Sequence, residues 1–300
     1  MRSREDLLAL AARYATEQRA PAATITKEIL HYEILFALQE SGAMQTLTFQ
    51  GGTSLRLCYE GNRYSEDLDF AGGRDFDPAS MGPFCDLLKR EIAGAYGLTV
   101  NIKQPKAGDF DADSGVTVSR WSANILVPNP DRSTPQKQLI KIEVAAIPAY
   151  DIDLRSVRLN YPHLPAQFSQ MLVPVESQVE ILADKIVALG ARPYFKARDV
   201  WDIKFLLDGG VAERKALPLV ARKLVDYGWT VDKFKAALAT RIDQLAEPET
   251  AVKFHAEMTR FVDTMVARYL TRPEFVTKFL ERSADLGRQV LEANLQAPES

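Results

Sequence analysis

The chain has 300 residues, of which 46% are hydrophobic and 26% charged, the composition of a globular protein. Its formal net charge of −3 excludes a strongly basic nucleic-acid coat protein but allows local basic patches. Cys58 and Cys85 form neither a metal-binding spacing nor a disulfide framework, so a reducing cytoplasm is the expected location. No stretch approaches the length of a membrane span, so no membrane partner is expected.

The first half of the sequence alternates helical and strand-like patterns. Helices are predicted at 4–19, 27–41 and 77–96, with Ser3 and Thr26 as N-caps and Gly97 as a stop signal. Strands are predicted at 46–50, 67–70, 98–103, 116–127, 138–147 and 157–160. Turn-forming residues predict loops at 108–115 and 128–135.

From Pro174 onward the pattern is helical. The predicted helices are 177–190, 197–207, 214–226, 231–246, 248–270 and 273–295. The proline-containing stretch 162–174 is the expected hinge or linker. The sequence therefore predicts an α+β domain at 1–173, with a mixed sheet flanked by helices, followed by a helical domain at 174–300.

The strongest chemical signal is the pair Asp67 and Asp69. Residues i and i+2 of a strand share a face, so both carboxylates point one way, while Leu68 and Phe70 point into a core. Adjacent carboxylates repel unless a proton or a cation lies between them, and hard oxygens suit Mg²⁺ or Mn²⁺. The pair predicts a metal site, and the structural alternative is an acidic strand on a solvated face.

A glycine pair just before this strand predicts a phosphate site. A Gly-Gly turn that opens a helix offers free backbone N–H groups and a positive dipole end to an anion. Hydroxyls in the first turn of that helix can bond phosphate. If the strand of Asp67 and Asp69 extends back to residue 63, the cation of Arg63 and the hydroxyl of Ser65 lie on the same face as the two carboxylates. The predicted nucleotide-binding residues are Gly51, Gly52, Thr53, Ser54, Arg63 and Ser65.

Further charged residues complete the predicted site. Glu143, on a predicted strand beside Lys141, could be a third metal ligand or could activate the attacking hydroxyl, and the alternative is an ordinary cross-strand Lys–Glu pair. Lys185 could contact the β- or γ-phosphate of a triphosphate, and Asp199 could hold Lys185 in place or contact the nucleotide. An ion-pair network between helices is the alternative reading of these two residues.

In order along about residues 25–210, these motifs resemble the AbiEii-type nucleotidyltransferase toxins of the DNA polymerase β-like nucleotidyltransferase superfamily. The matching blocks are Gly51-Gly52-Thr53, Arg63-x-Ser65-x-Asp67-x-Asp69, Lys141-x-Glu143, Asp184-Lys185 and Arg198-Asp199-x-x-Asp202. The fourteen-residue separation of Gly52 and Asp67 is longer than in many members, and Pro193 interrupts the stretch after Lys185.

The resemblance implies a nucleotidyltransferase domain and a helical domain with the active site in the cleft between them. It also implies Mg²⁺, a nucleoside triphosphate (NTP) donor, a tRNA 3′ end as acceptor and a cognate antitoxin. By matched position, Asp67 and Asp69 would bind metal, Lys185 would bind triphosphate and Asp199 would be essential. The alternatives are a small-molecule nucleotidyltransferase, a phosphotransferase and a non-catalytic module that binds RNA or protein.

Overall fold

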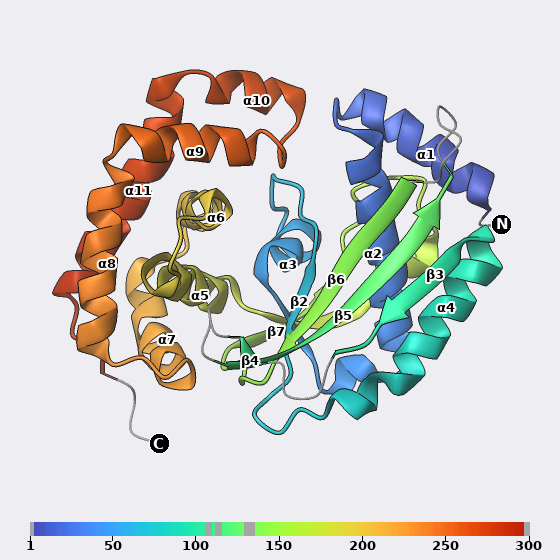
Figure 1. Cartoon of the computed structure of the whole chain (residues 1–300), viewed down its shortest axis with the longest axis horizontal. Coiled ribbons are helices and arrows are strands. Elements are labelled where there is room, and N and C mark those ends of the chain that lie inside the picture. The colour runs from blue at the N-terminus through green and yellow to red at the C-terminus, as the bar shows by residue number, and fades with distance from the viewer. Residues whose placement is uncertain (1–2, 106–109, 112–115, 129–135, 297–300) are drawn as a thin grey trace. The chain divides into compact units, whose positions relative to one another are not determined.

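The computed structural model describes residues 3–105, 110–111, 116–128 and 136–296. The chain forms two compact units, the first made of residues 1–109 and 117–175 and the second of residues 110–116 and 176–300 (Figure 1). In the described part of the chain, no helix combines the length and the apolar character that crossing a membrane requires.

The first unit combines helices with a sheet. Its helices are α1 (Arg4–Glu17), α2 (Ala22–Glu40), α3 (Gly51–Cys58) and α4 (Gly82–Tyr96), with short 3₁₀ helices η1 (Ala43–Gln45), η2 (Pro78–Met81) and η3 (Ala166–Gln170). Its strands are β1 (Thr48–Gln50), β2 (Leu68–Ala71), β3 (Thr99–Lys103), β5 (Val116–Val127), β6 (Gln136–Ala145), β7 (Ile152–Ser156) and β8 (Leu172–Glu176). The short strand β4 (Phe110–Asp111) lies between β3 and β5 in the sequence.

These strands form one mixed sheet, as predicted, in the order β3-β5-β6-β2-β1-β8-β7. Strand β2 lies near the middle, parallel to β6 on one side and antiparallel to β1 on the other. Strand β1 in turn runs parallel to β8, with Phe49 opposite Val175. The strand that carries Asp69 is therefore held by neighbours along both of its edges.

One face of the sheet packs against helices and supplies the core. Ile140, Ile142 and Val144 on β6 are fully buried, and they alternate with Lys141 and Glu143, which are not. On this side α2 packs against β6, and α4 packs against β3 near the edge of the sheet (Figure 1). Burial of the apolar set fixes the register, because a one-residue slip would bring every charged neighbour into the core.

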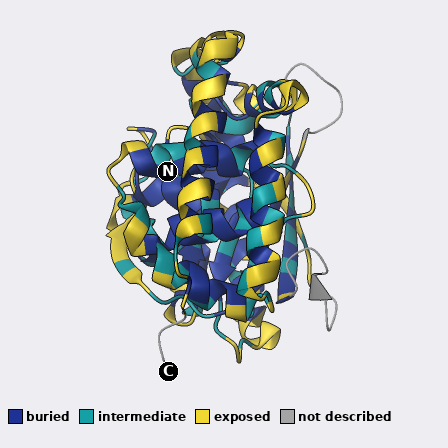
Figure 2. Ribbon diagram, turned by 90° about the vertical axis from the view of Figure 1, so that its left-hand side faces the viewer, coloured by how far each residue is buried: buried dark blue, intermediate teal, exposed yellow. Residues whose placement is uncertain are grey.

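The second unit is helical, as predicted. Its helices are α5 (Gln178–Ala191), α6 (Ala197–Asp208), α7 (Glu213–Asp226), α8 (Val231–Leu245), α9 (Pro248–Met258), α10 (Thr264–Leu270) and α11 (Pro273–Glu292). Buried and exposed stretches alternate along the helices in Figure 2, as expected for amphipathic helices with one face on a core. Within this core Trp201 stacks on Phe279, with 4.6 Å between ring centroids.

Several predicted boundaries were wrong. Helix α2 begins at Ala22, so Thr26 is not its N-cap but lies inside the helix and donates its hydroxyl to the carbonyl of Ala22. The predicted strand at 157–160 lies earlier, at β7, and the expected linker at 162–174 contains η3 and the first half of β8. The single helix predicted at 248–270 is two helices, α9 and α10. The loop predicted at 108–115 contains β4; the rest of it up to residue 115 and most of the loop at 128–135 fall outside the described residues.

Candidate active site

The glycine pair brings the start of α3 against two charged side chains. Gly51 has φ +78°, and a Cβ added there would lie 2.8 Å from Oδ2 of Asp69. A Cβ added at Gly52 would lie 2.1 Å from Nη2 of Arg63. Neither position has room for a side chain, so these glycines allow a close approach of backbone and charge as well as a tight turn.

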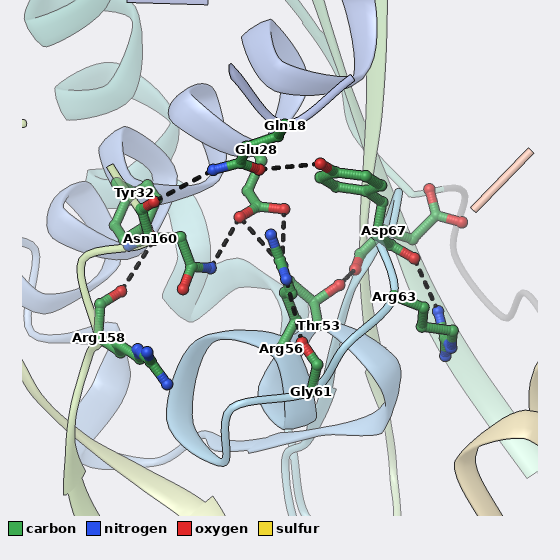
Figure 3. Close-up of polar contacts among 11 residues, drawn as sticks. Gln18, Glu28, Tyr32, Thr53, Arg56, Gly61, Arg63, Asp67, Arg158 and Asn160 are labelled. Atoms are coloured by element: carbon green, nitrogen blue, oxygen red, sulfur yellow. Dashed lines mark hydrogen bonds and ion pairs between the residues drawn. The ribbon is translucent and has the colours of Figure 1, made fainter. Parts of the chain in front are cut away.

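The two aspartates begin strand β2. Asp67 directly precedes the strand and Asp69 lies within it, and both are partly exposed, whereas Leu68 and Phe70 are fully buried. The hydroxyl of Thr53 donates to the backbone carbonyl of Asp67, which ties the first turn of α3 to this point (Figure 3). The Asp pair and the glycine turn therefore form one local arrangement within the first unit.

The hydroxyls of the turn have protein partners. Thr53 and Ser54 are almost fully buried, and Ser54 donates to the carbonyl of Gly51 at 2.8 Å. Both side chains thus fix the shape of the turn. The first N–H groups of a helix have no acceptor within that helix, so the backbone of Gly51 and Gly52 is the part of the turn suited to an anion.

Arg63 reaches the site from a loop. The backward extension of the strand was wrong, because β2 begins at Leu68 and residues 62–67 are not strand. Arg63 is nevertheless buried with its guanidinium over Gly52, and it donates to the carbonyl of Tyr64 at 3.0 Å. Ser65 is also buried, at 9% exposure.

A buried ion pair that the sequence analysis missed supports this loop. Arg56 Nε lies 3.1 Å from Oε2 of Glu28, and Arg56 also donates to the carbonyl of Gly61 at 3.1 Å (Figure 3). Burial alone would lower the pKa of Arg56, but Glu28 outweighs it and the pKa is raised. Asn160 donates to the same carboxylate at 2.8 Å. The pair anchors the loop between α3 and β2.

Glu143 lies beside Asp69 in the sheet. The register places Asp69 opposite Glu143 on β6 and opposite Gln50 on β1. Glu143 accepts a hydrogen bond from Arg120 Nε at 3.0 Å, so its cross-strand partner is an arginine on β5 and not a lysine.

The carboxylates suit a hard cation only in part. Among the described residues, no three His, Cys, Asp or Glu side chains are arranged to share one ion. Asp67 and Asp69 still offer partly exposed carboxylate oxygens next to a helix start. One or two carboxylates completed by phosphate oxygens and water is the usual way Mg²⁺ is held, so these two residues fit it.

In the second unit, Lys185 lies in a buried cluster between α5 and α6. Its Nζ is 2.8 Å from Oδ1 of Asp199 and 2.9 Å from Oδ2 of Asp202, and Arg192 Nε is 3.4 Å from Oδ2 of Asp199. Burial raises the pKa of Asp199, but Arg192, Lys185 and Lys196 outweigh it and hold that pKa well below its usual range. Asp199 is therefore ionised, and its carboxylate lies against the ammonium of Lys185.

Cations predominate around this cluster. Burial and the nearby Arg192 and Arg198 lower the pKa of Lys196 to about 8. Arg198 pairs with Glu257 at 3.5 Å and lies over the ring of Phe261. The predicted residues thus form two groups, one around Asp69 in the first unit and one around Lys185 in the second.

A second buried lysine, also missed from the sequence, ties α7 to α5. Lys223 Nζ lies 2.8 Å from Glu176, 2.7 Å from Glu180 and 3.1 Å from Asp184. Burial and the neighbouring Asp184 raise the pKa of Glu176 well above its usual range. Asp184 of the Asp184-Lys185 motif therefore pairs away from Lys185, with α7.

A known structure shares the fold of this chain. MenT4, a nucleotidyltransferase toxin from Mycobacterium tuberculosis H37Rv, is 18% identical over 94% of this chain and 97% of its own, with a TM-score of 0.55. JHP933 from Helicobacter pylori is 20% identical over 91% of this chain and 95% of its own, with a TM-score of 0.49. No curated protein sequence matches the chain. The model of the nucleotidyl transferase AbiEii toxins of type IV toxin–antitoxin systems matches residues 33–279, and the chain belongs to this family of nucleotidyltransferases.

Proposed function

We propose that the chain transfers nucleotides from an NTP to the 3′ end of a tRNA, in the cytoplasm, as a toxin that a cognate antitoxin silences. The observation that carries this proposal is the approach of Gly51 to Asp69, where a Cβ would lie 2.8 Å from the carboxylate. It supports the proposal because it sets a helix start, which favours phosphate, directly against an acidic group that favours a metal.

In this proposal Asp67 and Asp69 hold Mg²⁺ or Mn²⁺, whose coordination phosphate oxygens and water complete, and Glu143, in register with Asp69, takes the role of activating the attacking hydroxyl. The ion would neutralise charge on the α-phosphate. The Gly51–Gly52 backbone and Arg63 hold the phosphates, while Thr53, Ser54 and Ser65 shape the turn and loop that carry them. The acceptor hydroxyl bonds to the α-phosphorus, the bond from that phosphorus to the bridging oxygen breaks, and pyrophosphate leaves. The hydroxyl proton passes to Glu143 or to solvent.

Lys185 is proposed to contact the β- or γ-phosphate of the donor as a point charge. Asp199 acts on it as a positioning residue, because it holds the ammonium by a 2.8 Å contact. Asp202, at 2.9 Å, supports Lys185 in the same way. Burial of both carboxylates supports this role, since a buried ion pair keeps a long side chain in one conformation.

The test is incubation with each NTP, labelled on the α- or the γ-phosphate, plus total RNA and Mg²⁺. We expect α-label, and not γ-label, to move to a tRNA-sized band. Transfer of γ-label would indicate a phosphotransferase, and α-label on small molecules alone would indicate an antibiotic-type acceptor. No transfer of either label, with no rise in melting temperature on adding NTP and Mg²⁺, would refute the proposal in favour of a non-catalytic role.

Two variants make the test specific to the site. Asp69→Asn should abolish transfer, because it removes a charged ligand worth several kcal/mol of transition-state stabilisation. The matched control is Asp86→Asn, an exposed carboxylate on α4, which should transfer at the normal rate. Chelation with EDTA should stop transfer, and added Mg²⁺ or Mn²⁺ should restore it.

A further inference from the structure

The face of β3, β5 and β6 that is turned away from α2 and α4 carries lysines in register. Lys103 on β3 lies opposite Ser122 on β5, and Ser122 lies opposite Lys141 on β6. Both lysines are exposed, and Lys137 is exposed further along β6. The three ammonium groups therefore share one surface, which we call the lysine face.

The lysine face is basic on a chain that is acidic as a whole. The formal net charge of the protein is −3, yet no ion pair joins Lys103, Lys137 or Lys141 to another described residue. The acidic residue next to Lys141 on this face is Glu143, whose charge is matched by Arg120 at 3.0 Å. Among the described residues, no acidic side chain therefore neutralises the charges of these three lysines.

The lysine face leads directly to the proposed reaction site. Lys141 is two residues from Glu143 on β6, which is about 7 Å along a strand, and Glu143 is in register with Asp69. In the next row of the face, Asn101 lies opposite Asn124, and these amides can donate or accept hydrogen bonds. A chain laid across the face would therefore meet cations and amides first and the carboxylates last.

We propose that the lysine face binds the single-stranded 3′-terminal segment of the polynucleotide acceptor, with its phosphates on Lys103, Lys137 and Lys141. This assignment rests on the proposed function, because it places the terminal hydroxyl of the acceptor beside the reaction site at Asp67 and Asp69. Phosphates spaced along a strand match lysines spaced along a sheet, and such contacts carry little sequence information. The binding is therefore expected to be salt-dependent and tolerant of sequence.

The test measures binding of a 12-nucleotide single-stranded RNA, labelled with fluorescein at its 5′ end, by fluorescence anisotropy. Lys103→Glu with Lys141→Glu should raise Kd at least about tenfold at low salt. The slope of log affinity against log salt should fall by about 1.4, since each phosphate contact on a single strand contributes about 0.7. The matched control is Lys89→Glu with Arg90→Glu, which changes the net charge equally on exposed positions of α4. It should keep Kd within about twofold.

Competitors identify the class of ligand. If phosphate contacts dominate, DNA of the same sequence should compete with an inhibition constant within about tenfold of that of RNA. A larger preference for RNA would indicate an added contact with the 2′-hydroxyl. Both results support a polynucleotide ligand. Polyglutamate competing as well as RNA would assign the face to an acidic protein and overturn the proposal. An equal loss of binding in both double variants would also overturn it, because net charge alone would then explain the effect.

Activity separates this inference from the proposed function. If transfer occurs and Lys103→Glu with Lys141→Glu keeps a normal KM for RNA, the lysine face is wrong and the function stands. If RNA binding depends on the lysines but no NTP is ever transferred, the face stands and the function is wrong. The melting-temperature rise given by NTP and Mg²⁺ should be normal in both double variants, which confirms that the donor site is intact.

Discussion

Replacing Gly51 with alanine distinguishes the contribution of this turn to stability from its contribution to catalysis. The residue has φ +78°, where an L-residue costs about 1–2 kcal/mol. The smaller entropy of the unfolded alanine chain returns about 0.4–1 kcal/mol. The expected net loss in the free energy of unfolding is therefore only about 1 kcal/mol.

The effect on catalysis should be larger, because the new methyl group meets Asp69. The added Cβ would lie 2.8 Å from Oδ2, and ordinary contact begins at 3.4 Å, so the carboxylate must move by about 0.6 Å. Displacements of this order can cost about a hundredfold in rate, or about 2.7 kcal/mol of activation free energy. We therefore expect kcat for transfer to fall about a hundredfold in a protein that melts only a few degrees lower.

Gly73→Ala is the matched control for Gly51→Ala. Gly73 has φ +80°, and an added Cβ would meet no atom within 4 Å. The two variants should lose similar stability in thermal unfolding, while only Gly51→Ala loses activity. Equal activities in the two variants would refute the reasoning, since the contact with Asp69 would then have no catalytic consequence.

Other predictions concern the buried charges and a helix cap. Glu28→Ala leaves Arg56 buried without its carboxylate partner and should lower the free energy of unfolding in urea by about 3–5 kcal/mol. The control Glu17→Ala removes an exposed pair with Arg13 and should lower it by less than about 1 kcal/mol. Similar losses in the two variants would contradict the anchoring role of Glu28. The raised pKa of Glu176 means that its stabilising contribution is complete below its ordinary pKa of 4.5 and is lost as pH rises through the folded value. Glu176→Gln should therefore make the unfolding free energy of the second unit decline less steeply with rising pH, and an unchanged pH profile would argue against a protonated Glu176. Asp263→Ala should cost about 1 kcal/mol, because its side chain accepts from the N–H groups of Met265 and Val266 at the start of α10; an unchanged melting temperature would count against this cap.

The sequence predicted local features well where one short pattern decides the outcome. Ser3 caps α1 by accepting from the N–H of Asp6, and Gly97 ends α4 with φ +60°. The alternation of apolar and charged residues along β6 correctly predicted which of its side chains are buried. Asp263 is an N-cap residue before a helical pattern and so signals the start of α10. A single helix was predicted here because the apolar pattern continues across Asp263.

The remaining differences depend on contacts between distant residues. Strand β8 contains Pro174, and its pairing with β1 joins positions more than 120 residues apart, from Phe49 to Val175. Spacing could not show that Arg56 pairs with Glu28, since the two lie on different helices. Arg63 reaches Gly52 through a loop, where period-two reasoning does not apply. The sequence therefore predicted which residues lie near Asp69 better than it predicted the secondary structure that places each of them there.

Helix α5 takes part in two buried charge clusters at once. Glu180 and Asp184 bind Lys223 of α7, and the next residue, Lys185, binds Asp199 of α6. Local opening of α5 would have to expose both sets of charges together, which makes such opening rare. The amide protons of α5 should then be among the slowest of the second unit to exchange with deuterium, and the ammonium of Lys185 would stay in place between successive turnovers.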